Sequence, residues 1–96
     1  MIRDRTIRSL REIAWSLGAK AEGTQWHLFG SVERDEAGAA DIDLLILCKS
    51  DEQADALRRE IDPDALELPI HLAFMTFDEA AAIDVTAVQQ SRAIIP

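Results

Sequence analysis

Cysteine is nearly absent from this chain. Only one of the 96 residues, Cys48, is a cysteine, so no disulfide can form within the chain. A single thiol fits a reducing compartment, where cysteines are kept free. The simplest interpretation of Cys48 is a small apolar residue at the end of a strand rather than a reactive nucleophile.

Long hydrophobic runs are missing as well. No apolar stretch of the sequence approaches the ~20 residues that a membrane-spanning helix requires. The first residues, MIRDRTIRSL, interleave arginine with isoleucine and lack the continuous apolar segment of a secretory signal. We therefore expect no membrane association and a cytoplasmic location.

Positive charge is scarce. The chain has 10 Lys and Arg against 18 Asp and Glu, a formal net charge of -8. Direct binding of nucleic acid requires clustered Lys and Arg, so the composition argues against that class of protein. Residues 1–20 hold five basic and two acidic groups, a net charge of +3, which leaves -11 on the remainder. An acidic body favours solubility and can hold divalent cations.

The hydrophobic pattern predicts a helix followed by strands. Apolar residues recur every three or four positions from Ile2 to Leu17, which indicates an amphipathic helix that ends at Gly18. The runs TQWHLF, DIDLLILC and IHLAFM have the β-branched, aromatic and aliphatic content of strands. The middle run is almost continuously apolar, as expected for a strand that is covered on both faces.

Further helices are predicted in the second half of the chain. Ser50 with Gln53, and Thr76 with Glu79, have the spacing of capping boxes that open helices. The C-terminal segment predicts a turn or two of helix and then a short edge strand at Arg92–Ile95. We therefore expect one domain over residues 1–96, of the small α/β (α+β) class. Its mixed sheet would have three to four strands, with helices packed mainly on one face.

Two short motifs stand where apolar runs end and begin. Residues 29–47 read FGSVERDEAGAADIDLLIL. Asp41 and Asp43 share one face of a strand, because side chains alternate, so both carboxylates can reach one hard cation such as Mg²⁺. Gly30 allows close approach of a phosphate to the backbone, and Ser31 offers a hydroxyl and an amide to bind it.

This arrangement resembles the signature of the DNA polymerase β-type nucleotidyltransferase superfamily, and specifically its minimal branch found in bacterial and archaeal two-gene modules. The family pattern is an apolar strand, Gly-Ser, a spacer, and Asp-x-Asp opening a second strand. Here WHLFGS is followed by nine residues and then by DIDLLIL. The resemblance implies that Gly30, Ser31 and Arg34 bind the triphosphate of ATP. It also implies that Asp41 and Asp43 ligate Mg²⁺, with a two-metal site compatible.

The third strand departs from the family pattern. Relatives that catalyse usually carry a third carboxylate there, and the position that aligns with it is His71. An imidazole can accept a proton from an attacking hydroxyl, but it is a poorer Mg²⁺ ligand than a carboxylate. The resemblance therefore gives Asp41, Asp43 and His71 as catalytic residues. Asp78, just past the strand, is a weaker substitute, and we expect His27 to be packed rather than a ligand.

The resemblance implies a metal-dependent enzyme that moves a nucleoside monophosphate, AMP in the expected case, from a nucleoside triphosphate to a hydroxyl. The acceptor would lie on a partner protein, because a short chain has no domain to hold it. In the family, the partner is often a small helical HEPN-type toxin, which the nucleotidyltransferase neutralises by modifying a tyrosine; a homodimer is also compatible.

Two alternatives stay open. His71 in place of a carboxylate would also fit a catalytically degenerate binding protein that acts by partner occlusion. A third interpretation, less favoured than these two, is a fragment of a larger transferase whose second domain was lost or lies on a separate chain.

Overall fold

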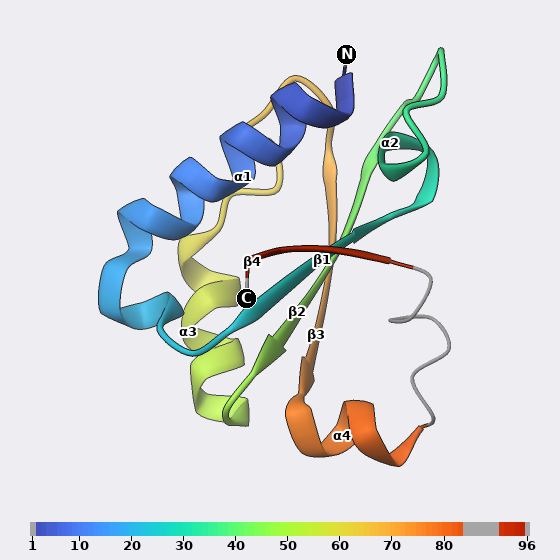
Figure 1. Ribbon diagram of the computed structural model, residues 1–96. Helices are drawn as coiled ribbons and strands as arrows, with labels where there is room; N and C mark the ends of the chain where they lie inside the picture. Colours follow the sequence, from blue (N-terminus) through green and yellow to red (C-terminus); the bar gives the residue numbers. More distant parts are fainter. Residues whose placement is uncertain (1, 84–90, 96) are drawn as a thin grey trace.

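A four-stranded mixed sheet organises the fold (Figure 1). The computed structural model describes residues 2–83 and 91–95. The strands are β1 (Gln25–Phe29), β2 (Ile42–Cys48), β3 (Ile70–Thr76) and β4 (Arg92–Ile95), in the order β3-β2-β1-β4. Strand β1 is antiparallel to β2 and β4, whereas β2 and β3 are parallel. The predicted fold class is confirmed, including the edge strand at the C-terminal end.

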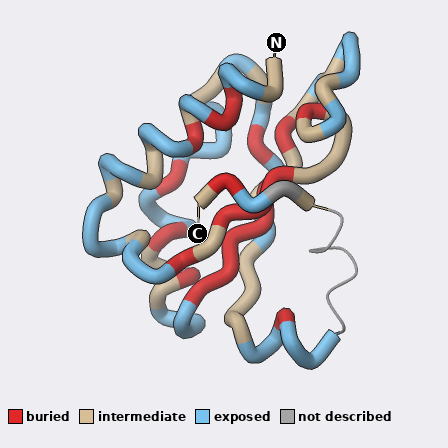
Figure 2. The backbone as a smooth tube through the Cα atoms, viewed as in Figure 1, coloured by how far each residue is buried: buried red, intermediate tan, exposed pale blue. Residues whose placement is uncertain are grey.

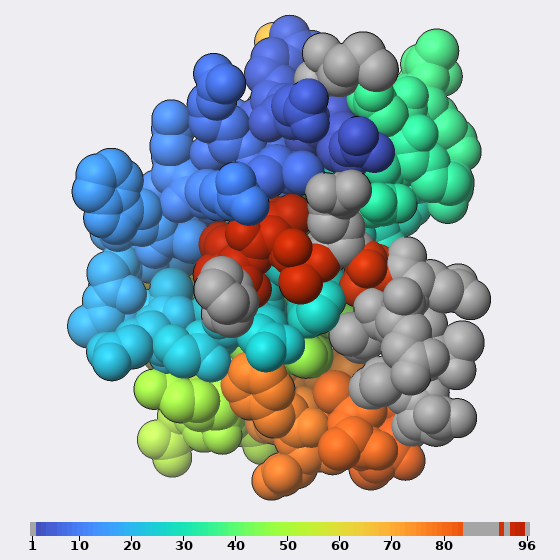
Figure 3. Space-filling view, viewed as in Figure 1, coloured from blue at the N-terminus to red at the C-terminus, as the bar shows by residue number. Residues whose placement is uncertain are grey.

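Helices connect and cover the strands. They are α1 (Ile2–Leu17), the 3₁₀ helix η1 (Gly18–Ala21), α2 (Gly30–Glu33), α3 (Asp51–Glu60) and α4 (Phe77–Ala82). Helices α1 and α3 pack on one face of the sheet and contribute to the same core. Helix α4 follows β3 and packs near the other face. In the space-filling view, β4 lies between α1 and β1 on the surface (Figure 3).

The main core lies between the sheet and helices α1 and α3. Buried residues follow the strands and the inward sides of these helices (Figure 2). The fully buried Trp26 keeps its polar atom satisfied, because its Nε1 donates to Thr24 Oγ1 at 3.0 Å. Thr24 Oγ1 in turn donates to the carbonyl oxygen of Ala21 at 2.6 Å. This chain of hydrogen bonds ties the end of η1 to the start of β1.

A smaller cluster covers only part of the opposite face. It contains Leu45 and Leu47 of β2 with Ala80 of α4, and Phe29, Met75 and Phe77 pack against it. This second cover explains why β2 reads as a nearly continuous apolar run. Among the described residues, this cluster does not extend to the start of β2, where the polar side chains described below lie.

The two predicted capping boxes have different outcomes. At α4 the box is complete, because Glu79 N donates to Thr76 Oγ1 at 3.1 Å and Thr76 N donates to Glu79 Oε1 at 2.9 Å. At α3, Gln53 N donates to Ser50 Oγ at 3.1 Å, as predicted. The Gln53 side chain, however, accepts from Lys49 N at 2.8 Å, so the second half of that box is displaced by one residue.

Two short helices were not predicted. Helix α1 ends at Leu17, and Gly18 follows it with a φ of +58°, as the predicted stop requires, but Gly18 also begins the 3₁₀ helix η1. Gly30 and Ser31 open the single-turn helix α2 instead of a simple turn. The helical turn predicted after residue 84 falls within residues 84–90, outside the described part of the chain. Within that described part, no helix is long and apolar enough to cross a membrane.

Cys48 closes β2 as a packed residue. It is fully buried, and burial raises the pKa of its thiol to about 11. A thiol with such a pKa is almost entirely protonated near neutral pH, and the protonated form is a poor nucleophile. The structure therefore agrees with the interpretation of Cys48 as a small apolar residue.

Candidate active site

The parallel pairing of β2 with β3 brings three polar side chains to one place. Asp43 of β2 is the register partner of His71 of β3, and Asp41 immediately precedes β2. Residues at alternate positions share a face of a strand, so all three project to the same side of the sheet. The amide of Ile42 donates to the carbonyl oxygen of Pro69 at 2.9 Å, which fixes the start of this pairing.

The imidazole of His71 lies beside both carboxylates. Its Nε2 is 3.6 Å from Asp41 Oδ2, and its Nδ1 is 4.0 Å from Asp43 Oδ1. The exposed fractions of the side chains are 64% for His71, 38% for Asp41 and 31% for Asp43, so the site is open to solvent. We call these three residues the carboxylate–imidazole cluster. The structure thus brings together the three residues that the sequence analysis gave as candidate catalytic residues.

Gly30 lies directly beside the Asp43 carboxylate of the cluster. It follows Phe29, the register partner of Asp43, and has a φ of +79°. A Cβ atom added to Gly30 would overlap the Asp43 carboxylate and would lie 3.2 Å from its Cγ. The carboxylate therefore occupies the space that a side chain at residue 30 would need. Only glycine provides both this backbone conformation and this close approach.

Helix α2 turns the backbone of Ser31 away from β1. The first amides of a helix have no partner within it and can bind an anion. The loop after α2 folds back, because Arg34 N donates to Gly30 O at 3.1 Å and Glu36 N donates to Ser31 O at 3.0 Å. The carbonyl groups of the Gly-Ser pair are thus engaged by the chain itself.

Helix α1 holds this loop from the other side. The amide of Arg3 donates to Asp35 Oδ1 at 3.1 Å, and the Arg3 guanidinium donates to Glu33 O at 3.2 Å. Asp35 has a φ of +56°, an unusual conformation for a residue other than glycine. Sequence reasoning missed these contacts. They join residues about thirty positions apart, and no local spacing signals them.

Arg34, a predicted phosphate ligand, is exposed and paired with Glu36. The hydrogen bond from its Nε to the Glu36 carboxylate is the main reason that the pKa of Arg34 is raised above its ordinary value. Asp43 contributes a smaller electrostatic share in the same direction. To contact a phosphate, Arg34 would have to exchange Glu36 for the new anion.

Asp78 lies outside the cluster. Because β2 and β3 are parallel, residue 43 pairs with residue 71, and residue 48 pairs with residue 76 at the opposite end of both strands. Asp78 follows that far end in the first turn of α4. The suggestion that Asp78 could replace the third carboxylate is therefore wrong in this structure.

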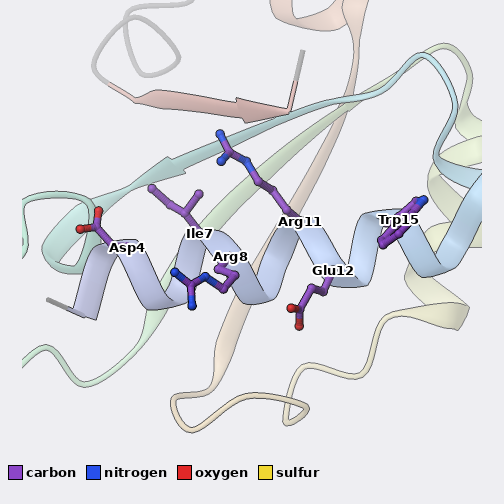
Figure 4. Close-up of a pocket in the computed structure, with 6 residues that line it drawn as sticks. All are labelled: Asp4, Ile7, Arg8, Arg11, Glu12 and Trp15. Carbon is purple, nitrogen blue, oxygen red and sulfur yellow. The ribbon is translucent and has the colours of Figure 1, made fainter.

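A surface hollow lies on the α1 side of the molecule. Ile7, Arg11 and Trp15 of α1, with three charged neighbours, line a cavity of about 590 Å³ (Figure 4). Trp15 is 86% exposed, and Arg11 Nε donates to the carbonyl oxygen of Ile94 in the edge strand β4 at 3.0 Å. Neither Asp41, Asp43 nor His71 lines this hollow.

Comparison with known proteins decides the family. A family model described as "Nucleotidyltransferase domain" matches residues 7–94, nearly the whole chain. This chain belongs to the nucleotidyltransferase domain family. A crystal structure of a candidate nucleotidyltransferase is similar in fold, with a TM-score of 0.60 and 18% sequence identity. The likeness covers 92% of this chain and 96% of the other. No curated protein matches the sequence significantly.

Family membership supports the general activity, transfer of a nucleotidyl group from a nucleoside triphosphate. Nucleotidyltransferase domains generally use divalent metal ions, and the donors here fit such an ion in part. Asp41 and Asp43 offer carboxylate oxygens on one face of the sheet, and the Asp43 carboxylate lies against Gly30. Magnesium is commonly held by one or two carboxylates together with substrate phosphates, which matches this donor set.

His27 is the second histidine on this face of the nucleotidyltransferase domain. It is buried, with Nδ1 3.0 Å from Ser91 Oγ and Nε2 3.3 Å from Gln25 Oε1. The Gln25 oxygen can only accept, so the neutral ring donates through Nε2 and accepts the Ser91 hydroxyl proton at Nδ1. The structure thus shows a packed histidine, as expected from the sequence.

Burial should make His27 a source of acid sensitivity. It lowers the pKa of His27, so the unfolded chain takes up a proton first as the pH falls. This contribution to stability is complete above an unfolded pKa of about 6.5 and is lost as the pH falls through the folded pKa. Urea unfolding measures the free energy of unfolding at about pH 7.5 and at about pH 5.5. We expect this free energy to fall less between the two pH values in His27→Gln than in the wild type. Equal losses in both proteins would contradict this prediction.

Proposed function

We propose that this nucleotidyltransferase domain transfers AMP from ATP to a hydroxyl group on a partner protein, with Mg²⁺ as the metal. The observation that carries the proposal is that Asp41, Asp43 and His71 lie together, with Gly30 packed against the Asp43 carboxylate. A Gly-Ser loop and two carboxylates on adjacent strands can receive opposite sides of a metal-bound triphosphate. The open surface leaves room for an acceptor that a second protein brings.

Each residue has a distinct role in this proposal. The Gly30–Ser31 backbone and the Ser31 hydroxyl bind and orient the triphosphate, and Arg34 neutralises phosphate charge after leaving Glu36. Asp41 and Asp43 hold the cation, which when bound would polarise the phosphoryl group and stabilise the leaving pyrophosphate.

His71 serves as the general base. The acceptor oxygen forms a bond to the α-phosphorus while the bond from that phosphorus to the pyrophosphate oxygen breaks. The proton of the acceptor hydroxyl passes to an imidazole nitrogen, which its 64% side-chain exposure makes accessible to a protein-borne hydroxyl. Pyrophosphate carries away the electron pair of the broken bond, so atoms and charge balance.

The biological setting is proposed from the resemblance of the Gly-Ser and Asp-x-Asp motifs to those of the minimal nucleotidyltransferases. The proposed partner is a small helical HEPN-type toxin, and the chain would act as its antitoxin in the cytoplasm. Residues 1–96 would work as a single nucleotidyltransferase unit, with no direct role for nucleic acid. A homodimer of the chain is compatible with this scheme.

Transfer of label tests the proposal directly. The chain and the HEPN-type partner are incubated with Mg²⁺ and ATP labelled either at the α-phosphate or at the γ-phosphate. We expect the α label to become covalently attached to the partner and the γ label to appear in pyrophosphate. Attachment of the γ label would indicate phosphate transfer instead, and attachment of neither label would contradict nucleotidyl transfer.

A second candidate function has its own supporting observation. Trp15 is 86% exposed beside the hollow on α1, where Arg8 and Arg11 also lie. An exposed aromatic side chain among arginines is typical of a protein-binding surface. The chain could therefore neutralise a partner by occlusion without chemistry. In that case Trp15→Ala would weaken partner binding while the double variant Asp41→Asn, Asp43→Asn would neutralise as well as wild type.

A further inference from the structure

The carboxylate–imidazole cluster is an incomplete metal site. Among residues 2–83 and 91–95, no group of three or more His, Cys, Asp or Glu side chains is placed to hold a metal ion by itself. The cluster offers the oxygens of two carboxylates and the nitrogens of one imidazole. Magnesium and manganese prefer oxygen ligands, and imidazole suits other metals better. The protein therefore supplies two effective ligand groups.

Solvent exposure weakens what two carboxylates can do alone. Asp41 and Asp43 are each about a third exposed, so water competes with them for the cation and screens their charge. Magnesium also gives up its own water reluctantly and usually needs substrate phosphates to complete its shell. Binding of a free cation at this site should consequently be weak.

The position of His71 limits the number of cations. Two-metal sites place their ions ~3.5–4 Å apart and need anionic ligands for both. On the β3 side of Asp43, the neighbouring side chain is the imidazole, and the next acidic residue along β3 and α4 is Asp78 at the far end of the strand. Among the described residues of β3 and α4, a second cation would therefore find no anionic ligand next to Asp43.

A triphosphate that binds without a cation lacks positive charge to offset its own negative charge. Two carboxylates face it, and Arg34 is already paired with Glu36 in the loop that would contact it. A bare triphosphate would therefore meet net negative charge, and a cation would reduce that repulsion. Cation and nucleotide should each bind poorly alone and well together, which is a positive coupling between two ligands.

We infer that the site holds one divalent cation, and holds it only together with a nucleoside triphosphate that completes its ligand shell. The inference rests on the proposed function, because it takes the same residues as the nucleotide site. The inference adds that one cation binds per nucleotide and that cation and nucleotide bind cooperatively. Both properties are attributed to the presence of an imidazole, His71, where a third carboxylate would otherwise lie.

The test uses Mn²⁺ as a spectroscopic probe and a non-hydrolysable ATP analogue. Electron paramagnetic resonance measures free Mn²⁺ in the presence of the protein, and calorimetry measures analogue binding with and without Mn²⁺. We expect the wild type to bind Mn²⁺ alone at least ~10-fold more weakly than His71→Asp, which supplies the third carboxylate. His71→Asn is the matched control, because it removes the imidazole without adding charge, and it should show no gain.

The outcomes separate this inference from the proposed function. One Mn²⁺ per bound analogue in wild type, with analogue binding at least ~10-fold weaker when Mn²⁺ is removed, supports the inference. Tight binding of Mn²⁺ without analogue, or two Mn²⁺ per chain with it, overturns the inference and leaves the proposed transfer intact. Failure of the folded wild type to bind the analogue with Mn²⁺ present overturns both.

Discussion

Asp41→Asn together with Asp43→Asn is expected to lower the rate of nucleotidyl transfer by at least ~10²-fold. Asparagine keeps the size of each side chain but removes the anionic oxygens that the proposed metal-bound triphosphate requires. The α-label transfer assay measures the loss, and calorimetry should show that binding of the Mg²⁺-nucleotide disappears with it. Equal nucleotide binding by this double variant and by the wild type would contradict the proposed site.

Folding of this double variant should be unimpaired. Both carboxylates are partly exposed and lie on the same side of β2, where His71 is the neighbouring basic group. Removing two like charges from one face relieves repulsion, so the midpoint of thermal unfolding should stay the same or rise. Asp78→Asn is the control, because Asp78 is also exposed but lies at the far end of β3. It should leave transfer unchanged and cost at most about 1 kcal/mol of stability, because its charge lies in the first turn of α4.

Local sequence signals were sufficient for much of the fold. The run from Ile42 to Cys48 is apolar at every position except Asp43, and the structure covers it on both faces. Thr76 and Glu79 satisfy each other through two hydrogen bonds, because a capping box depends only on residues three apart. The Gly-Ser and Asp-x-Asp motifs also marked the strands β1 and β2 that carry the candidate site, since each motif lies next to its own apolar run.

The geometry of the candidate site depends on contacts between residues far apart in the sequence, which the spacing of residues along the chain does not predict. The approach of His71 to both aspartates follows from the parallel register of β2 and β3, which is set across an intervening helix. Helix α2 was missed because its four residues are too few for a periodic pattern. The left-handed conformation of Asp35 depends on tertiary contacts with α1, so its sequence neighbours give no sign of it.

Gly30→Ala is expected to reduce transfer by about 10²-fold, because misplacement of a reacting group by about 1 Å costs that much. The new methyl group would overlap the Asp43 carboxylate and lie 3.4 Å from its Cβ, so Asp43 must rotate away from the cluster. The φ of +79° adds a backbone cost of about 1 kcal/mol for alanine. Transfer assays and urea unfolding measure the two effects separately.

Gly38→Ala separates the two causes of that loss. Gly38 has a φ of +80°, close to that of Gly30, but no atom lies within 4 Å of a Cβ added there. It should therefore lose a similar free energy of unfolding from backbone strain and keep full transfer activity. Asp43→Ala removes the group that collides with residue 30, so Gly30→Ala should destabilise that background less than it destabilises wild type. If Gly30→Ala and Gly38→Ala had equal activity, the close approach of Gly30 to Asp43 would have no part in catalysis.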